Sequence, residues 1–122
     1  MKKILLVLIL IFSVGCQAQI QIQSIDGNTV YHMLENKEQF VLIDAREESE
    51  YKEGHIPGSI LIPLGNIEKD IKKYVSSTDD MIVVYCRSGR RSRQACQRIM
   101  DMGYTQVYDM GGIIDWKYEI EK

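Results

Sequence analysis

The chain lacks several features that would narrow its function at once. Its 15 lysine and arginine residues nearly balance its 17 aspartate and glutamate residues, so the formal net charge is −2. A charge this small gives no indication of nucleic-acid binding. The sequence has only two prolines, and we find no low-complexity tract and no internal repeat. With 122 residues, 45% hydrophobic and 26% charged, it fits a single globular domain.

A long hydrophobic run is also missing. The apolar run at residues 4–12 has nine residues, whereas a membrane-spanning helix needs about 20. Lys2 and Lys3 precede the run, and small residues and Cys16 follow it. This order of cationic, apolar and small residues predicts a secretory signal peptide at residues 1–15. A buried N-terminal helix or strand is the alternative, but no polar residue interrupts the run.

The end of this segment, Ser-Val-Gly-Cys at residues 13–16, resembles a bacterial lipobox. The resemblance implies cleavage before Cys16 and diacylglycerol on its thiol, which would anchor the protein to a membrane of the cell envelope. Each methylene buried in the bilayer contributes about 0.8 kcal/mol to membrane binding, and anchoring becomes stable when more than one acyl chain is attached. We then expect a polar tether at residues 16–23 and the folded domain at residues 24–122. We expect this exported domain to be a monomer on the periplasmic or outer face of a membrane.

Cysteines are few, and a lipid on Cys16 leaves only Cys86 and Cys96. One disulfide is the ordinary expectation for an exported protein with two cysteines. However, Cys96 falls about two helical turns into the segment after the Cys86 loop, roughly 10 Å along a helix axis. A disulfide needs Cα atoms within about 7 Å. We therefore expect free thiols, with Cys96 as a small core residue.

Strand-like and helix-like segments alternate along the chain. The patterns predict strands at residues 40–44, 59–63, 81–85 and 105–110, and helices at residues 28–38, 47–54, 64–75, 90–103 and 111–120. Asn28 is the expected N-cap of the first helix, and Gly103 is the expected C-cap of the helix at residues 90–103. The alternation predicts an α/β domain with a mostly parallel sheet between helices. In such sheets ligands bind beyond the carboxyl ends of the strands.

One of these strand ends carries Cys86, followed by a loop that opens a predicted helix. Backbone N–H groups at a helix N-terminus are unpaired and partially positive, so they favour a thiolate. Gly89 and the serines of the loop let backbone amides approach a bound anion closely. The pattern predicts a nucleophilic thiolate that acts on a small oxyanion. The alternative is a buried, inert cysteine with solvated arginines on the helix.

The same loop, Cys-Arg-Ser-Gly-Arg-Arg-Ser at residues 86–92, resembles the active-site loop of rhodanese-domain sulfurtransferases. Residues 42–63 resemble a family segment in which a strand is followed by an acidic residue and an arginine, and then by a Glu-x-Gly-His-Ile-Pro-Gly-Ala stretch. Ser59 stands in place of the alanine. Residues 103–116 resemble its closing strand, Gly-Gly turn and tryptophan. The resemblance covers about residues 24–122. It implies a rhodanese-like three-layer α/β/α fold with a mostly parallel central sheet.

The resemblance also implies a reaction. Cys86 attacks the outer sulfur of a donor such as thiosulfate, sulfite leaves, and a persulfide remains until a thiol, or cyanide in an assay, accepts the sulfur. Loop amides are expected to stabilise the anionic sulfur, without a metal or organic cofactor. Arg90 also fits a solvated helix-face charge, as does Arg93, whereas Arg87 and Arg91 are candidates for attracting the donor. The expected substrate-binding residues are Arg87, Ser88, Gly89, Arg90, Arg91 and Ser92.

Other residues are expected to support this loop. Asp44 and Arg46 should pair and hold it from the neighbouring strand, His55 should be structural in a tight turn, and Trp116 should belong to the core or a pocket wall.

Two other functions stay open. The first is a non-catalytic role, either as a persulfide carrier or sensor that uses Cys86 or as a binding module, which the presence of Cys86 disfavours.

The second alternative is a phosphatase of the same fold class. Such phosphatases have a longer loop, in which the cysteine and the arginine lie one position further apart than Cys86 and Arg91 do here. The shorter loop favours a single sulfur atom over a tetrahedral phosphate.

Overall fold

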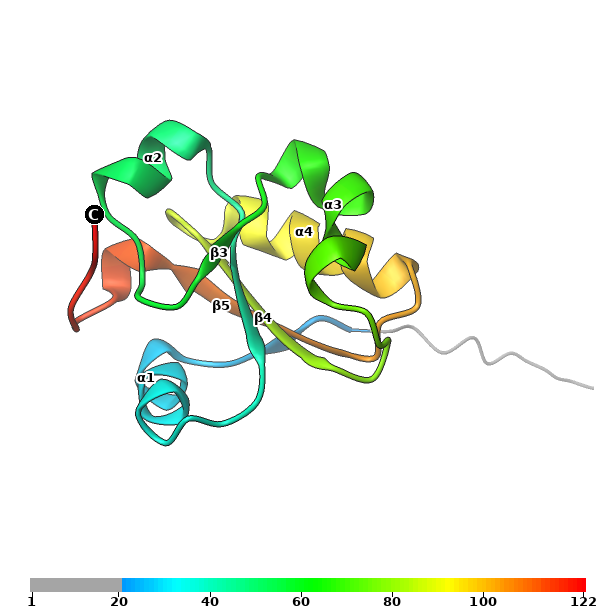
Figure 1. The fold of residues 1–122 in the computed structure, drawn as a ribbon, viewed down its shortest axis with the longest axis horizontal. Helices are drawn as coiled ribbons and strands as arrows, with labels where there is room; N and C mark the ends of the chain where they lie inside the picture. Colours follow the sequence, from blue (N-terminus) through cyan, green and yellow to red (C-terminus); the bar gives the residue numbers. More distant parts are fainter. Residues whose placement is uncertain (1–20) are drawn as a thin grey trace, which may run out of the picture.

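A parallel sheet of five strands runs through the middle of the protein in the computed structural model, which describes residues 21–122 (Figure 1). The expected signal peptide, the lipobox and most of the expected tether lie outside the described residues. The strand order is β1-β5-β4-β2-β3, with every pair of neighbours parallel. The strands are β1 (Gln23–Ser24), β2 (Val41–Asp44), β3 (Ile60–Leu61), β4 (Met81–Cys86) and β5 (Gln106–Gly112).

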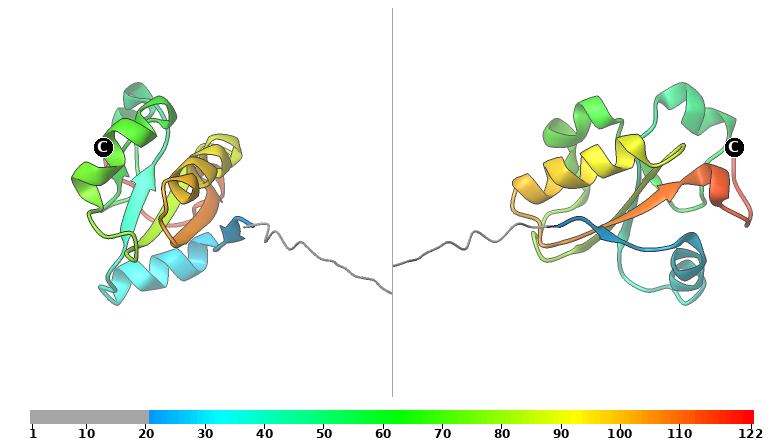
Figure 2. Two further views of the ribbon diagram at one scale, coloured as in Figure 1. Left: turned by 90° about the vertical axis from the view of Figure 1, so that its right-hand side faces the viewer. Right: turned by 180° about the vertical axis from the view of Figure 1, so that it is seen from behind.

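Helices cover both faces of this sheet, which confirms the predicted α/β architecture (Figure 2). Helices α3 and α4 pack on one face, and α1 packs on the other. Helix α2 lies near the carboxyl ends of the strands (Figure 1). The helices are α1 (Gly27–Glu35), α2 (Glu48–Glu53), α3 (Ile67–Tyr74) and α4 (Arg90–Asp101), with 3-10 turns η2 (Leu64–Asn66) and η3 (Ile113–Asp115).

Strand β4 is apolar throughout because it is covered on both faces. Its side chains alternate between the two cores, as the period of a strand requires. Ile82 and Val84 join the core under α3 and α4, while Val83 and Tyr85 join the core under α1. All four are fully buried, and each buried aliphatic side chain contributes about 1.5–3 kcal/mol. The strand thereby fixes the position of Cys86 at its end.

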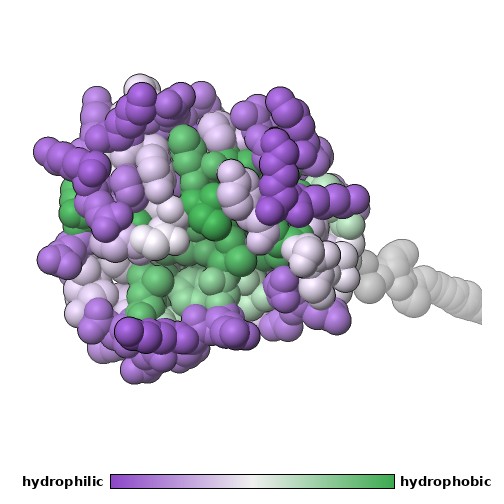
Figure 3. Space-filling model, viewed as in Figure 1, coloured by the Kyte–Doolittle hydropathy of each residue, from purple (hydrophilic) through white to green (hydrophobic). Residues whose placement is uncertain are grey.

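The edge strand β3 is short and only half-covered. Ile60 and Leu61 are partly exposed, and apolar residues are visible in the middle of this face, between the polar surfaces of α2 and α3 (Figure 3). A two-residue edge strand offers little unpaired backbone to another chain. No helix among residues 21–122 has both the length and the hydrophobicity needed to cross a membrane.

Several details differ from the sequence-based expectations. Met102, not Gly103, is the C-cap of α4, and Gly103 follows it with a φ of 103°. The predicted closing helix at residues 111–120 is wrong, because only the turn η3 forms there and the chain then runs on without a helix. Asp26, not Asn28, is the N-cap of α1, and its side chain accepts a hydrogen bond from Thr29 N. Strand β1 was not predicted, since two residues carry no usable periodicity.

Candidate active site

Cys86 is the last residue of β4, and its sulfur faces the start of α4. The Gly89 N–H donates a hydrogen bond to Cys86 Sγ across 3.1 Å. The residue is only 1% exposed, so the thiol lies at the bottom of the loop. The loop lies between α2 and η3 at the carboxyl edge of the sheet (Figures 1 and 2). This is the edge at which parallel α/β sheets bind their ligands.

The surroundings of the thiol favour its ionised form. Burial raises the pKa of Cys86, but hydrogen bonds from the Ser92 side chain and from the N–H groups of Ser92, Gly89 and Ser88 more than offset it. The net result is a Cys86 pKa below the ordinary value for a thiol. The Ser92 hydroxyl is the largest contribution that lowers the pKa, and the converging backbone amides at the N-terminus of α4 follow it, as expected for a reactive cysteine.

Two glycines give the loop its shape. Gly89 caps α4 with a φ of 111°, which is left-handed backbone that favours glycine. Gly112, in β5, allows the loop to approach closely, because a β-carbon there would lie 2.3 Å from the Arg87 carbonyl oxygen. That carbonyl accepts a hydrogen bond from Ile114 N at 3.2 Å. The loop is therefore fastened to the end of β5 on one side.

Ser92 connects the Cys86 loop with β5 through a hydrogen bond. It is fully buried, and its hydroxyl donates to Asp109 Oδ1 at 2.7 Å. The same carboxylate oxygen accepts the Gly111 N–H at 2.9 Å. Because a hydroxyl has one proton, Ser92 donates either to Asp109, as it does in the structure, or to the Cys86 sulfur, and only the second arrangement lowers the pKa of Cys86.

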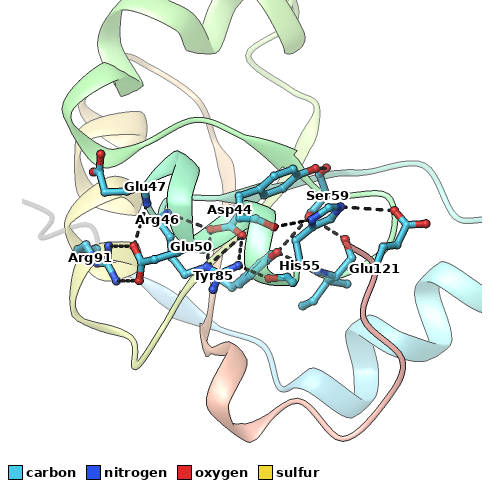
Figure 4. Close-up of polar contacts among 12 residues, drawn as sticks. Asp44, Arg46, Glu47, Glu50, His55, Ser59, Tyr85, Arg91 and Glu121 are labelled. Carbon is cyan, nitrogen blue, oxygen red and sulfur yellow. Dashed lines mark hydrogen bonds and ion pairs between the residues drawn. The ribbon is translucent and has the colours of Figure 1, made fainter.

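The loop arginines fall into two groups. Arg87 and Arg90 are exposed at the rim, as is Arg93 further along α4. Arg91 instead forms a bidentate ion pair with Glu50 of α2, with Nη1–Oε1 and Nη2–Oε2 distances of 2.7 and 2.9 Å (Figure 4). The Arg91 hydrogen bonds lower the pKa of Glu50 to about 2. Among residues 21–122, Arg87 and Arg90 form no ion pair, so these two guanidinium groups of the loop are available to an anion.

Comparison with known proteins agrees with this geometry. Residues 27–119 match the model of the rhodanese-like domain. The chain belongs to the rhodanese-like domain family. A sulfurtransferase from Allochromatium vinosum is 35% identical over 96 residues, covering 78% of this chain and 88% of that protein. Thiosulfate sulfurtransferase PspE from Escherichia coli is 40% identical over 73 residues, covering 60% of this chain and 70% of the relative.

A solved structure supports the same assignment. A rhodanese with anions from E. coli superimposes with a TM-score of 0.64 at 36% identity, covering 67% of this chain and 96% of the other. The rhodanese fold, expected from the sequence, is confirmed. Relatives named as sulfurtransferases support sulfur transfer as the general activity of this rhodanese domain.

Asp44 and Arg46 form a buried pair in the rhodanese domain, as expected. Arg46 Nη2 lies 2.8 Å from Asp44 Oδ2 and donates to the Gly54 carbonyl at 2.7 Å (Figure 4). The Arg46 guanidinium carbon also lies 5.8 Å from the centre of the Tyr85 ring. The pair therefore connects the two ends of α2 with Tyr85 of β4, which is the residue directly before Cys86.

His55 makes contacts of a structural kind. Its ring stacks on Tyr51 at 3.7 Å, and Nδ1 donates to the Tyr51 carbonyl at 2.9 Å (Figure 4). Its backbone pairs with Glu121 through two hydrogen bonds of 2.9 and 2.8 Å. These contacts hold the C-terminal segment against the end of α2. Trp116 is half-buried and lines clefts on this side of the protein.

The remaining expectations concern the second thiol and metals. Cys86 and Cys96 are both free, and Cys96 is a fully buried core residue of α4. Among residues 21–122, no three histidine, cysteine, aspartate or glutamate side chains cluster so that they could hold a metal ion.

Glu50, Asp109 and Gly112 are parts of the site that were not predicted from the sequence. The Gly-Gly pair at residues 111–112 is a sequence feature that could have indicated Gly112, but no sequence pattern indicates the two carboxylates.

Proposed function

We propose that this rhodanese domain transfers sulfane sulfur from thiosulfate, or from a similar anionic donor, to a thiol through a persulfide on Cys86. The observation that carries the proposal is the 3.1 Å hydrogen bond from the Gly89 N–H to Cys86 Sγ at the start of α4. It supports a thiolate as the resting nucleophile. Preorganised amides of this kind stabilise charge on sulfur as it develops.

The proposed first half-reaction balances without a cofactor. The Cys86 thiolate attacks the outer sulfur of thiosulfate, a new S–S bond forms, and the bond to the sulfite sulfur breaks. Sulfite leaves with the electron pair of that bond, and Cys86 keeps an anionic persulfide. The exposed guanidinium groups of Arg87 and Arg90 can attract the dianionic donor and balance the charge of the departing sulfite.

The depth of the thiol restricts the donor. Because Cys86 is 1% exposed, only a slender reacting group can reach its sulfur. A terminal sulfur atom meets this requirement.

A tetrahedral phosphate is a poorer fit. The arginine that would grip it, Arg91, already has both terminal nitrogens on Glu50. Phosphate release from an aryl phosphate that is lost in a Cys86→Ser variant would contradict this assignment.

The proposal is tested by intact-mass measurement after incubation with thiosulfate. We expect the wild-type protein to gain one sulfur atom and to lose it when a thiol or cyanide is added. Cys86→Ser should gain none, whereas Cys96→Ala should behave like the wild type. No gain with any sulfane donor would remove the sulfurtransferase proposal. Rapid loading followed by negligible turnover would instead support the carrier or sensor function.

We further propose that the protein is a monomeric, membrane-anchored lipoprotein of the cell envelope, lipidated on Cys16. The support comes from the cationic, apolar and small residues of the N-terminal sequence. We expect the wild-type protein to partition into detergent and a Cys16→Ala variant to remain in the aqueous phase. Equal partitioning of the two would refute lipidation, and sedimentation in detergent would measure the oligomeric state.

A further inference from the structure

A cleft of about 320 Å³ lies beside the Cys86 loop, between α2 and the segment that follows η3. Two of its lining residues, Glu50 and Ile113, contact or adjoin that loop. Glu50 holds Arg91 through the bidentate ion pair. Ile113 directly follows Gly112, which packs on the Arg87 carbonyl. A molecule in this cleft would therefore lie next to the mouth of the loop.

The wall formed by the C-terminal segment is apolar. Ile113, Trp116 and Ile120 line it, and Ile120 is 50% exposed although its Cδ1 packs against Gly54. The backbone bridge between His55 and Glu121 holds this segment against the end of α2. The wall is thus a fixed part of the fold, and it suits the hydrocarbon part of an organic molecule.

The opposite wall carries negative charge. Glu50 is neutralised by Arg91, and Arg46 is neutralised by Asp44. Glu53 is exposed and, among the described residues, has no ion pair or side-chain hydrogen bond. The uncompensated charge of the cleft is therefore the Glu53 carboxylate, which attracts cations and repels anions.

We propose that this cleft binds the sulfur acceptor and that it favours a small organic thiol with an ammonium group on an apolar body. The inference rests on the proposed function and names the substrate class of its second half-reaction. The ammonium group would face Glu53, and the carbon chain would lie on Trp116 and Ile120. Donor and acceptor then bind at different places, because the anionic donor is attracted to Arg87 and Arg90, whereas the cationic acceptor is attracted to Glu53.

The transfer step in this arrangement is balanced. The acceptor sulfur attacks the outer sulfur of the Cys86 persulfide, and a new S–S bond forms. The bond between Cys86 Sγ and that outer sulfur breaks, and its electron pair returns to Sγ as the thiolate. The proton of the acceptor thiol ends on the released organic persulfide. No external oxidant or reductant takes part.

The experiment starts from the wild-type protein loaded with one sulfur atom, as verified by intact mass. Loss of that sulfur is then timed with cysteamine, 2-mercaptoethanol and 3-mercaptopropionate, with each rate expressed per concentration of thiolate. We expect cysteamine to react fastest and 3-mercaptopropionate slowest. Glu53→Gln should slow the reaction with cysteamine about two- to five-fold, the range for a solvent-exposed ion pair. It should leave 2-mercaptoethanol unchanged, and added salt should reduce the preference.

Glu48→Gln is the matched control. Glu48 lies on the same helix but outside the cleft, and it pairs with Lys52 at 3.2 Å. Its substitution should keep the wild-type order of acceptors. Equal effects of Glu53→Gln on cysteamine and 2-mercaptoethanol would overturn the acceptor site. Failure of the wild-type protein to load sulfur would instead overturn the proposed function, and it would be visible before any acceptor is added.

Discussion

The backbone of Gly112 packs against the Arg87 carbonyl so closely that a β-carbon on Gly112 would lie 2.3 Å from that oxygen and 2.8 Å from Ser88 Cα. The end of β5 and the Cys86 loop therefore share one surface with no space between them. The φ of Gly112 is −113°, so the requirement for glycine is steric and not conformational. The position of the loop amides around the thiol depends on this contact.

Gly112→Ala should consequently displace the loop. A displacement of about 1 Å can lower a reaction rate on the order of a hundred-fold, and overpacking should lower the free energy of unfolding by about 1–3 kcal/mol. Sulfur loading by thiosulfate and chemical denaturation measure the two effects. Gly65→Ala is the control, since nothing lies within 4 Å of a β-carbon there. Wild-type loading in Gly112→Ala would show that the contact does not position the loop.

The hydroxyl of Ser92 is expected to tune the Cys86 thiol. Removing it in Ser92→Ala should raise the pKa of Cys86, because the thiolate loses a hydroxyl that can turn from Asp109 and donate to it. Asp109→Asn should act in the opposite direction, since the hydroxyl is then freer to donate to sulfur. The pH dependence of iodoacetamide alkylation reports both shifts. Ser49→Ala, on the exposed surface of α2, should leave the profile unchanged, and shifts of the same sign in both Ser92 and Asp109 variants would contradict this role.

The Glu50–Arg91 pair predicts a pH-dependent contribution to stability. Because the folded pKa of Glu50 is lowered from 4.5 to about 2, the contribution is present above the unfolded value and is lost as the pH falls through the folded one. We expect Glu50→Gln to lower the free energy of unfolding by about 1 kcal/mol near neutral pH, since the pair is only partly buried. The difference from the wild type should shrink between pH 4.5 and 2. Urea denaturation across this range measures it, and a difference independent of pH would exclude the ion pair as its cause.

Local patterns were sufficient for most of the fold. The apolar run of β4 and the helical spacing of α4 identified the strand and helix that flank Cys86. The same reasoning failed for the predicted closing helix at residues 111–120. Gly111 has a φ of +93°, which a helix does not allow. Tyr118 stacks on Tyr31 of α1 at 3.8 Å, so tertiary packing, and not the local period, sets the path of this segment.

The site could be predicted only in part. The cysteine, its loop and the neighbouring Asp44 and Arg46 are local in sequence and carry recognisable residue types. Glu50 lies 41 positions from Arg91, and no local pattern reports a contact over such a separation. Arg91 was therefore predicted to attract the donor, whereas in the fold it has Glu50 as a carboxylate partner.

The two described thiols should differ sharply in reactivity. Hydrogen bonds keep the pKa of Cys86 low despite its burial, whereas burial raises the pKa of the Cys96 thiol far above its ordinary value. Iodoacetamide should therefore label Cys86 in the folded protein, while Cys96 should react only when the core opens. Peptide mass mapping over a time course, without and with urea, measures both rates. A Cys86→Ser variant should leave Cys96 unlabelled under native conditions. Comparable labelling of Cys96 in the folded state would mean that α4 opens readily, and the amide cradle at its N-terminus could not then hold a stable thiolate.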